Sequence, residues 1–476
     1  VVHLAAIELQ RLGRGLAEEG HGARDLVGAA HHGHQVVELE HAEVIHEAGV
    51  PVAAHAAEDH GPPLVPREGL GGRAHGLVAG HADRARLDAP LRGGEGGRGL
   101  VAAATRDHRE QQDHHATGPE ARADGEVDRD AGAVVHVHDH HAALIPFMMR
   151  NCFGYVKLSG IRTVLTIHNA QYQGWMGWEK ATYLPVWDTW KWGLLDWDNT
   201  VNPLACGIKC ADRVNTVSPG YMQELMDEAN GLESLFNYER GKCSGIINGI
   251  DYSVWDPEKD TYILDNFSLK DYEEGKKLNK EALCKQFNFD VNLPLIIFIG
   301  RLVQEKAADL LPASISRSFH DLNRKFSCLI LGSGETSVEN ELKALQSHWV
   351  GYYNTQIDYN EKLSHQMYAG GDFILMPSRV EPCGLNQLYA MRYGTVPVVR
   401  RTGGLRDTVI DFGEAGGYGI CFNNASIDDI VYSINRATEL YEDKEKLKEV
   451  RERMMKVNSS WESSAKKYIE LYESIY

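Results

Sequence analysis

Short apolar runs, each followed by a turn, recur along the chain after about residue 130. They are four to six residues long and rich in Val, Ile, Leu and Phe, which is typical of strands buried on both faces of a parallel sheet. Longer stretches of mixed apolar and polar residues between them predict helices, for example over residues 274–287. Alternating strands and helices predict an α/β fold built from doubly wound parallel sheets. The runs lie at residues 162–167, 295–299, 326–331, 373–377 and 396–399.

Residues 1–130 do not share this pattern. No Lys, Asn, Ser, Cys, Met, Phe, Tyr or Trp occurs from Val1 to Pro146, and 18 of the 22 His lie in the first 141 residues. A segment without aromatic residues does not build an ordinary core. Nearly all its residues are amino acids whose codons begin with G or C, as expected when a gene with G or C wobble bases is translated in the wrong frame or from the wrong strand. We therefore interpret residues 1–130 as an anomalous, low-complexity segment that is disordered.

A His-rich extension that binds a metal is the alternative interpretation of this segment. Two clusters have suitable spacing: His31, His32 and His34, and further along the chain His138, His140 and His141. Inspection of the coding DNA in every frame separates the two interpretations.

Composition and charge exclude several classes of function. The formal charge of −18 argues against a nucleic-acid partner or an anionic membrane surface. Hydrophobic residues make up 43% of the chain, which is ordinary for a globular protein, and no apolar stretch is long enough to span a membrane. The eight Cys lack the paired spacing of a metal site, and no basic-then-apolar signal segment opens the chain. We expect reduced thiols in a cytoplasmic or plastid compartment.

The strongest candidate chemistry follows the apolar run at 373–377. Glu381, Cys383 and Gly384 come directly after it and are expected to open a helix. The first backbone N–H groups of a helix have no intrahelical partner and attract anions. A carboxylate beside free N–H groups predicts a site for a sugar or a phosphate.

A second Gly-rich turn follows the next strand, which ends near residue 399. Thr402, Gly403 and Gly404 precede another expected helix, and the glycines allow the backbone to approach a ligand closely. Since the carboxyl ends of neighbouring parallel strands meet at one edge of a sheet, both turns are expected to contribute to one site.

Two cations follow the strand at 295–299. Arg301 comes after Gly300, and Lys306 lies five residues further on. An Arg can bind phosphate oxygens through two parallel N–H groups, and a Lys acts as a point charge. This spacing predicts a diphosphate site at the carboxyl edge of the sheet.

These motifs, together with several others between residues 134 and 476, resemble the bacterial glycogen synthases and plant starch synthases. That family consists of retaining glucosyltransferases of the GT-B type, in which two doubly wound Rossmann-like domains face a cleft. The other motifs that carry the resemblance are the strand and His-Asp at 134–144, His168-Asn169 with Tyr172-Gln173-Gly174, the segment 205–219, and Asn248-Gly249-Ile250-Asp251.

The resemblance implies roles for individual residues. It implies that His168, Arg301, Lys306 and Glu381 are catalytic, with His168 beside the anomeric carbon, the two cations at the donor phosphates and Glu381 at the donor hydroxyls. It also implies that Tyr359 lies against the adenine ring, although packing remains the alternative. Asp139 and Asn248 have a structural alternative too, as a polar strand end and as a residue that stabilises its own turn. The donor-binding residues implied are Asp139, Asn248, Tyr359, Cys383, Gly384, Leu385, Thr402, Gly403 and Gly404, with no metal ligand.

The resemblance also divides the chain. Residues 131–258 correspond to the remaining part of the N-terminal, acceptor-side domain, and residues 259–455 to the C-terminal domain that binds the nucleotide sugar. Residues 456–476 correspond to a helix that crosses back to the first domain. The Trp-rich stretch at 175–197 is either an amphipathic helical excursion that packs or part of an acceptor surface.

The function implied is transfer of glucose from ADP-glucose to the non-reducing end of an α-1,4-glucan with retained configuration, without a cofactor. A front-side displacement is expected, because no carboxylate is placed as a nucleophile. The alternatives are a GT-B enzyme that uses UDP-glucose and a catalytically impaired glucan-binding protein.

The family's Lys-Thr-Gly-Gly-Leu loop is absent, since no Lys precedes Lys157. We therefore expect the first half of the N-terminal domain to be missing or replaced, and this chain to be weakly active or inactive.

Overall fold

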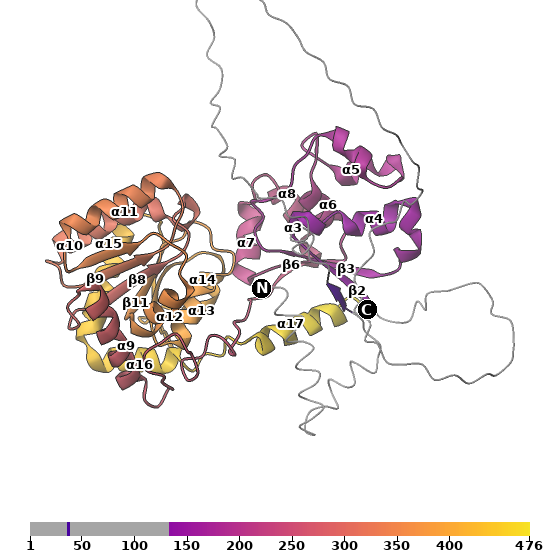
Figure 1. Cartoon of the computed structure of the whole chain (residues 1–476). Coiled ribbons are helices and arrows are strands. Elements are labelled where there is room, and N and C mark those ends of the chain that lie inside the picture. The colour runs from indigo at the N-terminus through magenta and orange to yellow at the C-terminus, as the bar shows by residue number, and fades with distance from the viewer. Residues whose placement is uncertain (1–35, 39–132) are drawn as a thin grey trace, which may run out of the picture. The chain divides into compact units, whose positions relative to one another are not determined.

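The computed structural model describes residues 36–38 and 133–476 (Figure 1). Most of the segment 1–130, including His31, His32 and His34, lies outside the described residues. The interpretation of that segment as a translation artefact is therefore untested by the structure. Its described part is the backbone of one short strand, β1 (Val36–Glu38).

A six-stranded parallel sheet organises the C-terminal half of the chain. Its order is β10-β9-β8-β11-β12-β13, so the chain starts in the middle, proceeds to one edge, and then returns to fill the other side. This is the order of dinucleotide-binding sheets, in which ligands bind where the direction reverses, here between β8 and β11. The strands are β8 (Leu295–Ile299), β9 (Ser327–Leu331), β10 (Tyr353–Gln356), β11 (Phe373–Met376), β12 (Val396–Arg400) and β13 (Ile420–Phe422).

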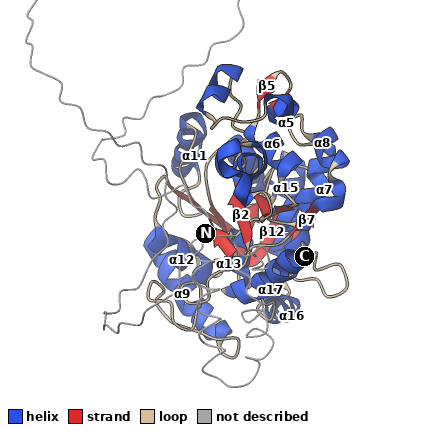
Figure 2. Cartoon of the chain, turned by 90° about the vertical axis from the view of Figure 1, so that its right-hand side faces the viewer, coloured by secondary structure: helices blue, strands red, loops and turns tan. Residues whose placement is uncertain are grey.

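Helices cover both faces of this sheet (Figures 1 and 2). α10, α11 and α15 lie on one face, and α9, α12 and α13 on the other. The α/β class that the alternating pattern predicted is confirmed. The helices are α9 (Tyr272–Phe287), α10 (Leu311–Asp321), α11 (Thr336–His348), α12 (Glu361–Gly370), α13 (Asn386–Arg392), α14 (Gly403–Thr408), α15 (Ile427–Glu442) and α16 (Lys444–Met454).

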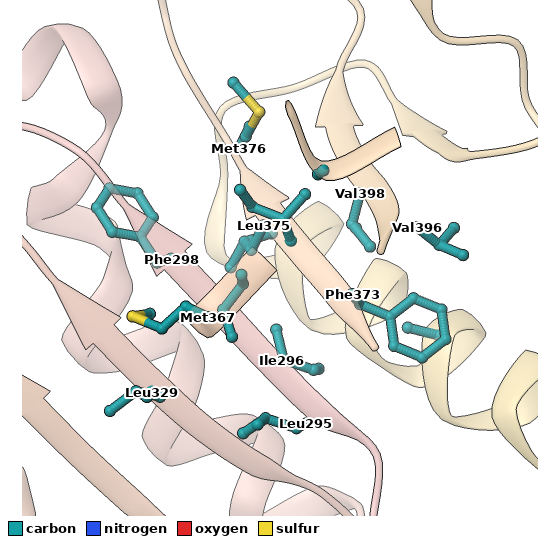
Figure 3. Packing of buried hydrophobic residues seen from close by; sticks show 14 of the residues in the cluster. Leu295, Ile296, Phe298, Leu329, Met367, Phe373, Leu375, Met376, Val396 and Val398 are labelled. Carbon is teal, nitrogen blue, oxygen red and sulfur yellow. The ribbon is translucent and has the colours of Figure 1, made fainter. Parts of the chain in front are cut away.

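The core holds β11 between β8 and β12 (Figure 3). Phe373 pairs with Ile296 on one side and with Val396 on the other, and all three side chains are buried. Burial on both faces fixes the register, because a slip of one residue would exchange the two faces of the strand. The loops that follow β8, β11 and β12 therefore begin from well-defined positions.

A second parallel sheet, with the order β1-β2-β3-β6-β7, organises the N-terminal half. β1 pairs in parallel with β2, with Val36 opposite Val134. The strands after β1 are β2 (Val134–His138), β3 (Arg162–Ile167), β6 (Arg213–Thr216) and β7 (Cys243–Gly245). The α-helices that accompany them are α3 (Asp139–Ala142), α4 (Ile145–Asn151), α6 (Pro203–Cys210), α7 (Pro219–Asp227) and α8 (Glu233–Tyr238).

The Trp-rich excursion between β3 and α6 is not one amphipathic helix. It consists of short 3-10 turns, η2 (Trp178–Tyr183) and η3 (Thr189–Lys191), the four-residue α5 (Trp192–Leu195), and a small hairpin of β4 (Asp196–Trp197) and β5 (Thr200–Val201). Its tryptophans divide between two environments: Trp178 and Trp187 pack on a buried cluster, while Trp190 is 90% exposed.

The last helix, α17 (Trp461–Glu473), packs on the N-terminal sheet. Leu471 and Ile475 join Val134, Val164 and Ile246 in a buried cluster. Burial of these apolar side chains stabilises the C-terminal segment against a sheet that lies more than 200 residues earlier in the chain.

Candidate functional site

The loops after β8 and β11 meet at the point where the strand order reverses. The first loop contains the short 3-10 turn η5 (Gln304–Lys306), and the second begins at Ser378. The backbone N–H groups of Arg379 and Val380 donate to the Glu305 carbonyl at 2.9 and 3.3 Å. These bonds hold the two loops together, so Lys306 and Glu381, which are 75 positions apart in sequence, occupy one site.

Lys306 and Glu381 form the centre of this site. The Lys306 Nζ atom lies 2.7 Å from each carboxylate oxygen of Glu381. The Ser378 hydroxyl donates to the same carboxylate at 2.9 Å. Glu381 is 7% exposed, so the pair is screened little by solvent.

Arg301 extends this charged group toward solvent. Its guanidinium lies 3.0 Å from the Glu305 carboxylate, and the other oxygen of Glu305 lies 3.9 Å from Lys306 Nζ. Burial lowers the pKa of Arg301, but the charge of Glu305 and a hydrogen bond with Tyr172 raise it by more. The pKa of Arg301 therefore lies above its usual value. With a side chain 58% exposed, Arg301 remains accessible to an anionic ligand.

The loop at 381–385 is not the start of a helix, contrary to the expectation from sequence. α13 begins at Asn386, because Gly384 has a φ of +72°, which a helix does not allow. The Gln387 side chain donates to the carbonyls of Cys383 and Gly384 at 3.1 and 3.0 Å and holds the loop. Among the described residues, the N–H groups of Cys383, Gly384 and Leu385 have no acceptor, so they remain available for a ligand.

The Cys383 thiol is buried and faces Asn248. Burial raises the pKa of Cys383 to about 12, although a hydrogen bond from the Asn248 backbone N–H opposes the shift. The thiol is therefore neutral at physiological pH and serves packing rather than nucleophilic chemistry. Asn248 itself is 7% exposed.

The turn at Thr402, Gly403 and Gly404 approaches protein rather than open space. A Cβ on Gly403 would lie 2.1 Å from the Glu381 carbonyl oxygen, and one on Gly404 would lie 2.0 Å from the Cys383 carbonyl oxygen. The Gly404 N–H donates to the Glu381 carbonyl at 3.1 Å. In the structure these glycines allow this turn to brace the loop that carries Glu381.

Glu224 of α7 binds the same turn. Its carboxylate accepts from the Gly403 N–H at 2.8 Å, from Arg406 at 2.7 Å and from the Thr402 hydroxyl at 3.2 Å. The Glu224 carboxylate thus binds two of the donors of this turn in the structure. The donor-binding role that the resemblance implies for Thr402, Gly403 and Gly404 stays a prediction.

His168 lies at the end of β3, beside His138 and Asp139. Its Nε2 atom is 3.1 Å from His138 Nδ1, and its backbone N–H donates to the Asp139 carboxylate at 2.7 Å. Burial lowers the pKa of His168, although Asp139 opposes the shift, and burial together with His168 lowers the pKa of His138 to about 3. Both rings are neutral at pH 7. The contact between them is therefore a hydrogen bond between two uncharged imidazole rings.

Asp139 and Tyr359 occupy contrasting positions. Asp139 has a φ of +52°, a left-handed conformation that Asp tolerates better than most residues, and it holds the His168 loop through a backbone hydrogen bond. Tyr359 follows β10 and is 84% exposed, so its ring is free to stack on a ligand and does not contribute to the core.

The structure therefore brings Arg301, Lys306, Glu381 and the loop at 383–385 together, with Thr402, Gly403 and Gly404 behind that loop. His168 and Asp139 form a separate group on the N-terminal sheet, and Tyr172 reaches Arg301 from the same segment. Sequence analysis missed Ser378, Glu305, Glu224 and Tyr172. Only Tyr172 carried a signal, since it belongs to the Tyr-Gln-Gly motif; the others depend on contacts between distant segments.

No group of three or more His, Cys, Asp or Glu within residues 133–476 is arranged to hold a metal ion. None of the described helices combines the length and apolar content that a bilayer span requires.

Comparisons with known proteins agree with the geometry. The family model of the starch synthase catalytic domain matches residues 122–238, and that of glycosyl transferases group 1 matches residues 279–454. The chain is 53% identical over 342 residues to a glycogen synthase of Flavobacterium johnsoniae, covering 72% of each protein. It is 38% identical to a glycogen synthase of Thermodesulfovibrio yellowstonii, over 72% of this chain and 68% of that protein.

A solved structure shares the fold. The catalytic domain of starch synthase IV from Arabidopsis thaliana, bound to ADP and acarbose, matches with a TM-score of 0.66 and 32% identity over 72% of each chain. The GT-B architecture expected from the resemblance is confirmed. The chain belongs to the glycogen and starch synthase family of glycosyltransferases.

Proposed function

We propose that this chain transfers glucose from ADP-glucose to the non-reducing end of an α-1,4-glucan and retains the anomeric configuration. The observation that carries the proposal is the group formed by Arg301, Lys306 and Glu381 at the reversal of strand order, beside three backbone N–H groups that have no acceptor within residues 133–476. The Arabidopsis relative, solved with ADP and acarbose, supports a nucleotide donor and a glucan acceptor.

Arg301 and Lys306 are assigned to the diphosphate. Negative charge grows on the departing phosphate as the bond to glucose breaks, and fixed cations stabilise that charge without reorganising. Arg301 is exposed and offers two parallel N–H donors, whereas Lys306 lies deeper and offers a point charge. Tyr359, whose ring is exposed, is assigned to the adenine base.

Glu381 and the loop after it are assigned to the glucose. Glu381 is held by Lys306 and Ser378, which fixes it as an acceptor for sugar hydroxyls. The N–H groups of Cys383, Gly384 and Leu385 donate to the donor's oxygens. Neutral His168, held by Asp139, is assigned to the sugar side near the anomeric carbon, and Asn248 supports the Cys383 loop.

The displacement occurs on one face of the sugar. The bond from C1 to the diphosphate oxygen breaks as the acceptor hydroxyl oxygen forms its bond to C1, and the hydroxyl proton passes to the leaving phosphate. Glu381 is not placed as a nucleophile in this scheme, because its two oxygens are already bound by Lys306 and Ser378.

Glycogen elongation with either ADP-glucose or UDP-glucose tests the proposal. We expect incorporation from ADP-glucose to exceed that from UDP-glucose, and the new linkage to be α when its anomeric proton is observed by NMR. Preference for UDP-glucose would favour the alternative donor, and a β linkage would contradict retention.

A catalytically impaired glucan-binding protein is the second candidate. The observation that favours it is the absence of a Lys-Thr-Gly-Gly-Leu loop in this chain, since both walls of a site are needed to position donor and acceptor. Binding of glycogen without turnover supports this candidate, and normal turnover by this chain contradicts it. The similarity to bacterial relatives favours the cytoplasm over a plastid.

A further inference from the structure

A cavity of about 450 Å³ lies at the amino-terminal edge of the C-terminal sheet, opposite the edge that carries Lys306. Asp372 marks this edge: it directly precedes β11, and it accepts from the N–H of Leu295, the first residue of β8, at 2.9 Å. The cavity is walled by α9, α16 and the end of α15. It is therefore separate from the site proposed for the donor.

The lining of this cavity is rich in cations. Six basic side chains and three carboxylates line it, although burial lowers the pKa of one of the six, Lys276, well below its usual range, so the lining is locally cationic in a chain whose formal charge is −18. A local excess of this kind attracts anions that the rest of the surface repels. The basic side chains are Lys276, Lys277, Lys280, Lys444, Lys448 and Arg451, and the carboxylates are Glu273, Glu281 and Asp372.

The inner basic side chains already have partners within the protein. Asp372 lies 2.7 Å from Lys280 and 2.8 Å from Arg451. Lys276 turns away from the cavity, and its Nζ atom donates to the carbonyls of Ala369 and Tyr393 at 2.9 and 3.0 Å. These residues form a rigid floor rather than free charges.

The outer cations remain available. Among the described residues Lys444 has no carboxylate partner; its Nζ atom lies 3.3 Å from the centre of the Tyr441 ring. Lys448 pairs with Glu273 at 3.0 Å, with both side chains substantially exposed, and such a surface pair exchanges readily for a ligand. Lys444 and Lys448 lie one turn apart on α16, so both face the same opening.

Two buried donors in the lining also lack partners. The Tyr272 hydroxyl and the Arg451 Nε atom have no hydrogen-bond acceptor within the described part of the chain. Tyr272 is 3% exposed. Buried polar groups are nearly always hydrogen-bonded, so two orphan donors in one cation-rich cavity indicate an acceptor that the protein does not supply.

We propose that this cavity binds the phosphate group of a small phosphorylated metabolite, with Lys444 and Lys448 as cations, Tyr272 as a neutral donor, and Arg451 behind them. A phosphate offers several acceptor oxygens and about two negative charges, which matches unpaired donors and an excess of cations. The volume exceeds that of a free phosphate and suits a sugar phosphate, because small-molecule pockets are typically about 300–1,000 Å³.

Isothermal titration of the full chain with glucose 6-phosphate, inorganic phosphate or glucose tests this proposal. We expect glucose 6-phosphate to bind with a Kd of about 1 mM or below, and glucose not to bind. Lys444→Ala and Tyr272→Phe are each expected to weaken binding about tenfold. Lys446→Ala is the matched control, because Lys446 lies on the same helix but pairs with Glu449 outside the cavity.

Two further comparisons separate this site from others. Lys306→Ala is expected to leave the binding unchanged, which distinguishes this cavity from the donor site. If inorganic phosphate binds with the same affinity as glucose 6-phosphate, the cavity is a site for free phosphate. If inorganic phosphate binds more weakly, the cavity is a site for the phosphate ester. Both results support a phosphate site. Without ligand, Tyr272→Phe is expected to keep the parent's unfolding temperature, because the hydroxyl bonds to none of the residues that the structure describes.

The proposal is overturned if glucose 6-phosphate and inorganic phosphate show no saturable binding. It is equally overturned if Lys444→Ala binds them as the parent does. Should Tyr272→Phe fail to fold, Lys444→Ala still decides the question, because Lys444 is exposed and its truncation does not disturb the core.

Discussion

Lys306 donates from Nζ to both carboxylate oxygens of Glu381, at 2.7 Å each. The cation assigned to the donor phosphates is thus held by the carboxylate assigned to the donor sugar. A bound nucleotide sugar has to share Lys306 with Glu381, so phosphate binding and sugar positioning are coupled.

Glu381→Gln is expected to separate binding from turnover. Removing one negative charge beside Lys306 leaves that cation free for the diphosphate, so the affinity for ADP should stay the same or rise. Turnover should fall on the order of a hundredfold, because the acceptor for sugar hydroxyls loses its charge. Titration with ADP and a glycogen elongation assay measure the two effects. Loss of ADP affinity without loss of turnover would contradict the assignment.

Gly404→Ala is expected to destabilise the loop that carries Glu381. Its Cβ would lie 2.0 Å from the Cys383 carbonyl oxygen, and backbone displacement of this kind costs about 1–3 kcal/mol. Gly193→Ala is the control, because a Cβ there meets nothing within 4 Å. Urea denaturation gives the free energy of unfolding. If the two variants have the same free energy of unfolding, the Cys383 carbonyl does not lie this close to Gly404 in solution, and the prediction is wrong.

Glu224→Ala should lower the free energy of unfolding by about 1–2 kcal/mol, since it removes a charged acceptor from the buried Gly403 N–H and, with a smaller contribution, from the exposed Arg406. Glu228→Ala, on the exposed end of the same helix, is expected to have little effect. Denaturation of both variants measures the difference. No difference would mean that Glu224 does not hold the turn.

Stability is expected to fall as the pH decreases below 6.5. Burial and the neighbouring His138 lower the pKa of His136, and burial together with His168 lowers the pKa of His138 to about 3. Below pH 6.5 these His residues bind protons in the unfolded chain, whereas the buried rings of the folded chain stay neutral. For each His the free energy of unfolding therefore falls by about 2 kcal/mol between pH 6.5 and about pH 5. For His138 the loss continues until the pH reaches about 3.

Denaturation of the parent and of His138→Gln at several pH values checks this prediction. The variant should lose less stability on acidification than the parent does. His320→Gln, at an exposed position, should behave as the parent. A pH dependence that is identical in all three proteins would refute the buried, neutral state of His138.

Much of the fold was predictable because buried parallel strands leave an unmistakable local pattern. The runs at 162–167 and 295–299 coincide with β3 and β8, and the expected helix at 274–287 lies within α9. Helix boundaries were less predictable: the helix expected from residue 381 begins at Asn386, because Gly384 takes a left-handed conformation. The Trp-rich stretch was interpreted either as an amphipathic helical excursion or as part of an acceptor surface, and the structure divides it among several short turns, a four-residue helix and a small hairpin.

The candidate site was predictable where residue type alone carries the chemistry. Arg301, Lys306 and Glu381 were chosen as charged groups at strand ends, and the structure brings them together. The contacts that arrange them were not predictable, because they join segments far apart in sequence. Glu224 and Gly403 are 179 residues apart, and nothing local to either residue indicates the other. The contact of Gly403 and Gly404 with the loop that carries Glu381 was therefore not predicted.

Titration of the chain with ADP tests the central claim most directly, because it reports on the donor site independently of the acceptor side. Lys306→Ala should weaken ADP binding about tenfold to a hundredfold, the loss expected for one charge-assisted hydrogen bond. Lys362→Ala, an exposed Lys on α12, should bind ADP as the parent does. If Lys306→Ala and Lys362→Ala bind ADP with the parent's affinity, Lys306 does not hold the diphosphate and the account is wrong.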